Sequence, residues 1–74
     1  MSKFKIGQKY TDRKNGFTFE VIGRSKCYVE LTDGYTEGKF RLGVCSKIKP
    51  NGERVKQNEC VEFGYSTYKV NLIA

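Results

Sequence analysis

The sequence contains no histidine and no tryptophan, and a single proline among its 74 residues. Without histidine the commonest general acid and base is missing, and a cysteine nucleophile would lack its usual imidazole partner. The eight carboxylates are scattered along the chain, and a catalytic pair needs a desolvated cleft that so small a domain hardly provides. We therefore expect a protein that is not an enzyme and that has no catalytic residues.

The chain has three cysteines, and their spacing matches no metal-binding motif. Cys27, Cys45 and Cys60 are odd in number and form no Cys-x-x-Cys motif, which is not the pattern of a disulfide framework. No histidine is present to complete a zinc-binding set. The sequence therefore predicts no metal site and no cofactor, and free thiols that pack as small buried hydrophobes. The sequence leaves open whether one of them is exposed, and Cys60, which lies in a polar stretch, is the first candidate.

Long apolar runs are missing as well. No stretch approaches the roughly 18 apolar residues of a membrane span, and the opening MSKFKIGQKY lacks the hydrophobic region of a secretory signal. Together with the free cysteines, this predicts a cytoplasmic protein without membrane partners. The length is that of one small domain, residues 1–74, which we expect to be complete.

What the sequence does have is short segments in which apolar and polar residues alternate. This period of two, rich in β-branched and aromatic residues, is typical of half-buried strands. The segments are 17–22, 27–32, 39–45 and 67–73, with weaker candidates at Phe4 to Ile6 and from Val55. Hairpin-type turn signals stand at Asn15-Gly16, Asp33-Gly34 and Pro50-Asn51-Gly52.

This arrangement predicts an all-β fold: a small SH3-like barrel or a strongly bent antiparallel sheet of about five short strands. One helical turn over residues 43–48 is a minor alternative. The apolar face of the strands predicts the core, with Cys27 beside it. The expected core residues are Phe17, Phe19, Val21, Val29, Leu31, Phe40, Leu42, Val44, Val70 and Leu72.

Basic residues outnumber acidic ones by 14 to 8, and the excess is concentrated in residues 39–56, which hold six basic residues against one acidic residue. Such a surface is the electrostatic footprint of a polyanion binder, although small domains also carry charge for solubility. Lysine exceeds arginine, which favours phosphate contact over base reading. The sequence does not distinguish between DNA and RNA as the ligand. The expected nucleic-acid-binding residues are Lys39, Arg41, Lys47, Lys49, Arg54 and Lys56 on phosphates and Tyr35 for stacking or positioning, with Tyr28 as a second stacking candidate.

These motifs also carry a resemblance. The string Gly7…Tyr10-Thr11…Gly16-Phe17-x-Phe19-x-Val21-Ile22 continues through Val29-Glu30-Leu31-x-Asp33-Gly34-Tyr35 to Ile48-Lys49…Gly52…Val55-Lys56. Over residues 6–56 it resembles small β modules in proteins of phages of Gram-positive bacteria, which stand next to HNH endonuclease or integrase-like DNA-binding domains.

The resemblance implies a non-catalytic phage-type accessory protein that touches DNA in the host cytoplasm, with Tyr35, Lys49 and Lys56 in its binding surface. It does not imply a nuclease, because the chain has no histidine for an HNH motif. The exit segment, residues 48–56, is also longer than the pattern of these modules.

A second class of function stays open. If the protein is of phage origin, it could bind and inhibit a host enzyme or a defence complex by protein–protein contact. The interface expected for this is aromatic: Phe63, Tyr65 and Tyr68, with Phe4, Tyr10 and Ile22 as further exposed apolar positions. A third interpretation is that copies of the chain associate through an exposed strand edge. The chain is therefore expected to be a monomer or a small homo-oligomer.

Overall fold

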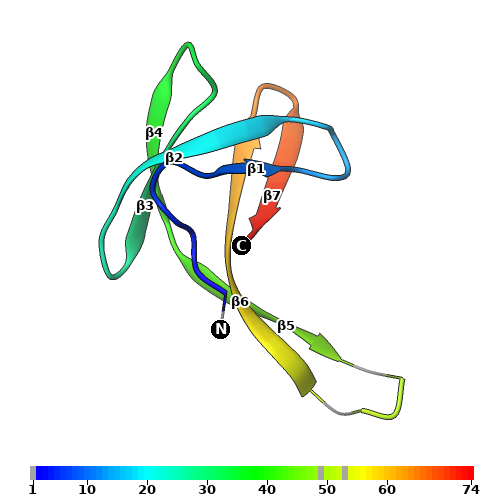
Figure 1. Cartoon of the computed structure of the whole chain (residues 1–74). Coiled ribbons are helices and arrows are strands. Elements are labelled where there is room, and N and C mark those ends of the chain that lie inside the picture. Colours follow the sequence, from blue (N-terminus) through cyan, green and yellow to red (C-terminus); the bar gives the residue numbers. More distant parts are fainter. Residues whose placement is uncertain (1, 49, 53) are drawn as a thin grey trace.

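The fold consists of two antiparallel sheets that follow one another along the chain (Figure 1). The computed structural model describes residues 2–48, 50–52 and 54–74, and for residues 46–48 and 54–56 it describes the backbone alone. The first sheet has the order β1-β2-β3-β4 and the second the order β5-β6-β7. The strands are β1 (Lys9–Thr11), β2 (Thr18–Arg24), β3 (Tyr28–Thr32), β4 (Glu37–Arg41), β5 (Gly43–Ile48), β6 (Arg54–Tyr65) and β7 (Tyr68–Ile73).

The all-β prediction is confirmed, and of its two forms the bent antiparallel sheet is the one that the structure adopts. The sheets meet where β4 contacts β6 and β1 contacts β7, and they do not close into a barrel. Within the described residues there are seven strands rather than about five. The β5–β6 hairpin extends away from the body formed by the other strands (Figure 1).

The segment 39–45, expected as one strand, is divided at Leu42. Its amide donates a hydrogen bond to the Cys27 carbonyl (2.8 Å), after which the chain changes partner from β3 to β6. The helical turn considered for residues 43–48 is wrong, since β5 runs there with β6 opposite it. The weak strand expected from Phe4 to Ile6 is wrong too: these residues belong to no strand, and an isolated bridge joins Ser2, before them, to Asn58.

The core lies between the sheets, and six of its members were expected from the alternation of the sequence. The buried apolar residues are Phe4, Phe19, Val21, Val29, Leu31, Val61, Val70 and Leu72. Phe17, Phe40 and Leu42 are partly buried and pack against this core. Two expectations were wrong: Val44 is 59% exposed because β5 leaves the body there, and Cys27 is exposed because it lies in the turn before β3.

The exposed cysteine is Cys27 and not Cys60, the candidate that the sequence suggested. Cys27 is exposed, whereas Cys45 and Cys60 are partly buried on one face of the β5–β6 hairpin. Burial raises the pKa of Cys60 to about 11, with smaller contributions from the Cys45 thiol and the Glu62 charge. The polar neighbours of Cys60 in the sequence misled the prediction, because its own side chain lies beside Gly43, with its Sγ 3.5 Å from where a Cβ would stand.

This difference predicts the order of alkylation. With iodoacetamide at about pH 8, Cys27 is modified first and Cys60 last, because roughly one Cys60 in a thousand is then a thiolate. Peptide mapping by mass spectrometry after a limited reaction measures the order. The same reaction in urea is the control, in which all three cysteines react at similar rates; Cys60 reacting first in the folded protein would contradict the structure.

Candidate functional site

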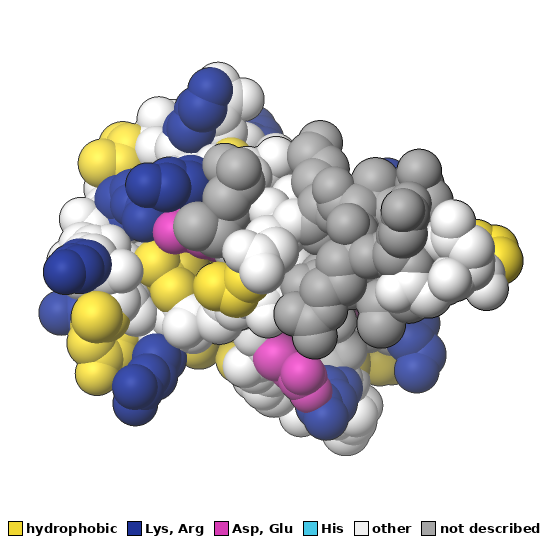
Figure 2. Space-filling model, turned by 90° about the horizontal axis from the view of Figure 1, so that it is seen from below, with side chains coloured by type: hydrophobic (Ala, Val, Ile, Leu, Met, Phe, Trp, Pro, Cys, Tyr) yellow, Lys and Arg dark blue, Asp and Glu magenta, His cyan; other side chains and the backbone are white. Residues whose placement is uncertain are grey.

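A basic hollow lies where the N-terminal segment, the β2–β3 turn and the β4–β5 corner meet. Its volume is about 360 Å³. Lys3, Arg24, Lys26, Cys27, Arg41, Leu42, Gly43, Val44 and Glu59 line it. On the face shown in Figure 2, Lys and Arg side chains surround exposed hydrophobic ones. The lining residues come from segments far apart in the sequence, so the hollow is a product of the fold.

A β-bulge at Ile22 determines which side chain at the end of β2 faces this hollow. Val21 pairs with Leu31 and Gly23 with Glu30, so β2 contains one extra residue at this point. Side chains alternate between the faces of a sheet, and the extra residue reverses the alternation beyond it. Arg24 consequently pairs with the buried Val29 and lies on the inner face of the sheet.

Arg24 reaches across to Glu59 on β6 and forms a two-pronged ion pair. Its Nη1 and Nη2 donate to the two carboxylate oxygens of Glu59 at 2.7 and 2.9 Å, and Nη1 also donates to the Phe4 carbonyl (2.7 Å). The Phe4 amide donates to Glu59 Oε1 (2.9 Å). The Arg24 hydrogen bond lowers the pKa of Glu59 and Glu59 in turn raises that of Arg24. Glu59, the one acid among the described residues that line the hollow, is thereby neutralised.

Three cations remain at the rim. Lys3, Lys26 and Arg41 are exposed, and the ion pairs found among the described residues are those of Arg24 with Glu59 and of Lys69 with Glu62. The three rim residues therefore present their charge to solvent. Like charges that gather around one hollow repel each other and attract anions.

The outer face of β3 and β4 adds two basic side chains, next to the two acidic ones of Glu30 and Glu37. Arg41 pairs with Tyr28 and Lys39 with Glu30, so that the two basic side chains share one face, as the sequence predicted. The Lys39 ammonium lies 5.2 Å from the centroid of the Tyr28 ring, whose residue is 41% exposed. Arg41 belongs both to this face and to the rim of the hollow.

The other predicted basic residues fall on the β5–β6 hairpin. Lys47 pairs with Lys56 and Arg54 with Ile48, which places their backbones on this hairpin. Their side chains, and Lys49 altogether, lie outside the described residues. The backbones of Lys47, Arg54 and Lys56 therefore lie on a projecting hairpin (Figure 1).

Tyr35 is not brought to the basic hollow. It lies in the β3–β4 turn and is 96% exposed, whereas Arg41 and Tyr28 pair at the opposite end of that hairpin. Sequence reasoning missed Lys3 and Lys26 as members of the site. No local pattern marks them, since each is an ordinary exposed lysine until the fold brings it to the hollow.

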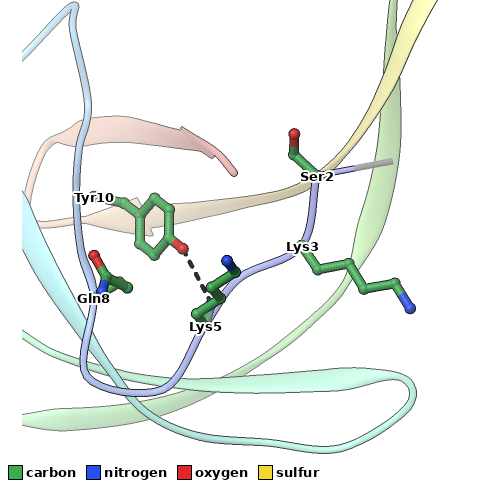
Figure 3. Close-up of a pocket in the computed structure, with 5 residues that line it drawn as sticks. All are labelled: Ser2, Lys3, Lys5, Gln8 and Tyr10. Carbon is green, nitrogen blue, oxygen red and sulfur yellow. Dashed lines mark hydrogen bonds between the residues drawn. The ribbon is translucent and has the colours of Figure 1, made fainter.

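A second, shallow hollow lies beside the N-terminal segment (Figure 3) and has a volume of about 590 Å³. Ser2, Lys3, Lys5, Gln8 and Tyr10 line it. The Tyr10 hydroxyl accepts a hydrogen bond from the Lys5 amide (3.0 Å), and the Tyr10 ring packs edge-on against Phe4. Figure 3 shows Lys3 extending away from Tyr10. Tyr10 therefore holds the N-terminal segment in place, and the exposed interface expected at Phe4 is wrong because Phe4 is buried.

The aromatic residues of the alternative interface mostly join the two sheets. The Phe63 ring stacks on Phe40 at 4.1 Å, and the Tyr65 ring packs edge-on against Phe19. The Tyr65 hydroxyl donates to Asp33, which lowers the Asp33 pKa to about 2, with help from backbone amides of the β3–β4 turn. Tyr68 alone of the three is more than half exposed.

Among the described residues, no three metal-binding side chains come together and no helix is long and apolar enough to cross a membrane. Comparison with family models, with curated proteins and with solved structures finds no match for this chain. The resemblance to phage modules therefore stays a prediction. Function has to be inferred from the chemistry of the surface itself.

Proposed function

We propose that the protein binds nucleic acid, without catalysis, through a basic surface formed by Lys39 and Arg41 on β4 and by Lys3 and Lys26 at the basic hollow. The observation that carries the proposal is the convergence of three cations from separate segments on one hollow whose single acid is already paired. Phosphate contacts supply most of the affinity of such surfaces and need no catalytic group.

Charge for solubility alone explains this arrangement less well. Solubility requires only a net charge spread over the surface, whereas here the rim residues lie close enough to line one hollow of about 360 Å³. The β5–β6 hairpin begins at this hollow and carries four further basic residues in its sequence, Lys47, Lys49, Arg54 and Lys56. We include the hairpin in the proposed surface and leave out Tyr35, which lies at the other end of β4.

The salt dependence of binding tests this proposal. We expect a fluorescently labelled single strand of about 20 nucleotides to bind with a logarithmic salt slope of at least about −2.8, from four contacts at about −0.7 each. Binding then weakens by at least about 50-fold between about 50 and about 200 mM salt. Anisotropy titrations with the wild-type protein measure the slope, and a slope near zero would overturn the proposal.

A pair of double variants locates the surface. Lys26→Ala with Arg41→Ala should reduce the slope by about 1.4, because two phosphate contacts are lost. Arg13→Ala with Lys14→Ala removes the same charge from exposed positions of the β1–β2 turn, outside the basic hollow, and should leave the slope unchanged. Equal losses in both double variants would show that only the net charge matters.

The alternative is contact with a host protein through Phe63, Tyr65 and Tyr68. It has less support, because Phe63 and Tyr65 are engaged between the sheets and only Tyr68 offers a large exposed area. It becomes the better proposal if the wild-type protein binds neither DNA nor RNA at low salt.

A further inference from the structure

Two of the ten aromatic rings have no aromatic neighbour. All five Phe rings and those of Tyr10, Tyr65 and Tyr68 pack against one another in edge-on or stacked pairs. Among the described ring contacts Tyr28 and Tyr35 take no part in such a pair. Tyr28 is the one of the two that lies on the basic surface, whereas Tyr35 is in a turn flanked by Asp33 and Glu37.

The Tyr28 residue is 41% exposed, and its ring contacts a lysine side chain. The Lys39 ammonium lies over the ring, 5.2 Å from its centroid. A cation takes this position over the flat face of a ring, so what this face of Tyr28 meets is the end of a flexible, exposed side chain. An exposed contact of this kind is weak, and a planar base can take the place of the ammonium, which then becomes available to a phosphate.

Both the amide and the carbonyl group of the Tyr28 backbone form hydrogen bonds. Its carbonyl accepts a hydrogen bond from the Ser25 amide (2.8 Å), and its amide donates to Ser25 Oγ (3.2 Å). On the other side Tyr28 pairs with Arg41 of β4. The ring therefore extends from a fixed position at the start of β3, and little order has to be gained when a ligand stacks on it.

Tyr28 also adjoins the basic hollow. Cys27 and Arg41 line the hollow, and they are the chain neighbour and the cross-strand partner of Tyr28. Side chains of paired residues stand about 5 Å apart at their Cβ atoms, so a group stacked on Tyr28 has the Arg41 guanidinium beside it. The surface thus combines one stacking position with phosphate-binding cations on either side.

This combination suits an unpaired strand. In a duplex the faces of the bases are covered by their neighbours, and only an unstacked base can lie on an aromatic ring. Resting on the proposed function, we infer that the ligand is single-stranded nucleic acid, with one base stacked on Tyr28 and the adjoining phosphates held by Arg41 and Lys26. Lys39 moves from the ring to a phosphate when the base binds.

The test compares three single variants with the wild-type protein, on a labelled single strand and on the duplex of the same sequence, in DNA and in RNA form. Tyr28→Ala should weaken single-strand binding by about 5- to 150-fold, the range measured for the loss of one stacked base. Tyr28→Phe keeps the ring and should bind like the wild type. Tyr35→Ala removes the other unpaired ring and should change nothing.

Two further readouts separate stacking from charge. The salt slope should stay the same in Tyr28→Ala, because no phosphate contact is lost, whereas Lys26→Ala with Arg41→Ala lowers it. The protein has no tryptophan, so tyrosine emission is directly measurable. Binding should quench part of this emission, and Tyr28→Phe should lose that quenching while it keeps its affinity.

The outcomes distinguish this inference from the proposal beneath it. If Tyr28→Ala binds as tightly as the wild type, or if the duplex binds as well as the single strand, the stacking inference is overturned while polyanion binding stands. If no probe binds to the wild-type protein at about 50 mM salt, the proposed function itself fails. A selective loss of single-strand binding in Tyr28→Ala alone supports the inference.

Discussion

Replacement of Glu59 by alanine will lower the free energy of unfolding by about 3 kcal/mol, the lower end of the range for removing one partner of a buried ion pair, because the Arg24 side chain is 22% exposed. Glu59 is 7% exposed and is the common partner of the Arg24 guanidinium and the Phe4 amide. Its loss leaves both donors without their acceptor in a partly buried site. A domain of 74 residues has a total stability of about 4–11 kcal/mol, so the variant should be largely destabilised in urea titrations.

The control for this prediction lies on the same strand. Glu62 forms an ion pair with Lys69, but both side chains are exposed, and such pairs contribute about 0–1 kcal/mol. Glu62→Ala should therefore unfold at nearly the wild-type urea concentration. Arg24→Met combined with Glu59→Leu removes both charges and should recover part of the loss, because the Phe4 amide still lacks its acceptor. Equal stability of Glu59→Ala and Glu62→Ala would contradict the assigned role of the buried pair.

The same ion pair makes the stability depend on pH. The pKa of Glu59 in the folded protein lies below its ordinary value of 4.5, mainly because of the Arg24 hydrogen bond. Its stabilising contribution is therefore complete above about pH 4.5 and is lost as the pH falls through the lower folded pKa. Asp33, with a folded pKa of about 2, acts in the same direction. Urea midpoints should fall below about pH 4.5, and less steeply in the double apolar variant.

Replacement of Phe4 by alanine has a comparable effect, a loss of about 3–5 kcal/mol, which is usual for a buried Phe. Phe4 is 1% exposed, its ring meets Tyr10 edge-on at 4.8 Å, and its backbone is bonded to Glu59 and Arg24. Truncating the ring empties a space in the core and releases the N-terminal segment from β6.

Ile6→Ala is the matched comparison, two residues further along the same segment. Ile6 is 62% exposed, and an exposed substitution usually changes stability by no more than about 0.5 kcal/mol. Urea unfolding of the two variants side by side measures the difference. Similar small losses for both would mean that Phe4 is at the surface, as the sequence had suggested, and that the N-terminal segment is not part of the core.

The secondary structure was largely predictable from the sequence. The alternation of residues 17–22 and 67–73 anticipated β2 and β7, because a period of two follows directly from strand geometry. The Asn15-Gly16 and Asp33-Gly34 turns were anticipated as well. Gly16 and Gly34 have φ of +76° and +96°, a region that only glycine enters without strain. These features depend on neighbours within a few residues.

The sites of the molecule were not predictable in this way. Phe4 and Ile6 alternate with lysines in the same manner, yet one is buried and the other exposed, because burial depends on what packs against the segment. Arg24 faces inward only because of the bulge at Ile22, and its partner Glu59 is 35 residues away. The spacing of Arg24 and Glu59 in the sequence does not predict their ion pair.

By itself, then, the sequence determined that the chain is built of strands and where most of them turn, since both follow from local conformational preferences and from the period of two. It also determined the excess of positive charge. Tertiary structure alone decided that Phe4 is covered and Val44 exposed, and which distant charges meet. Lys3, Lys26 and Arg41 share one hollow because two sheets and the N-terminal segment come together there, and such long-range contacts are set by how the whole chain packs.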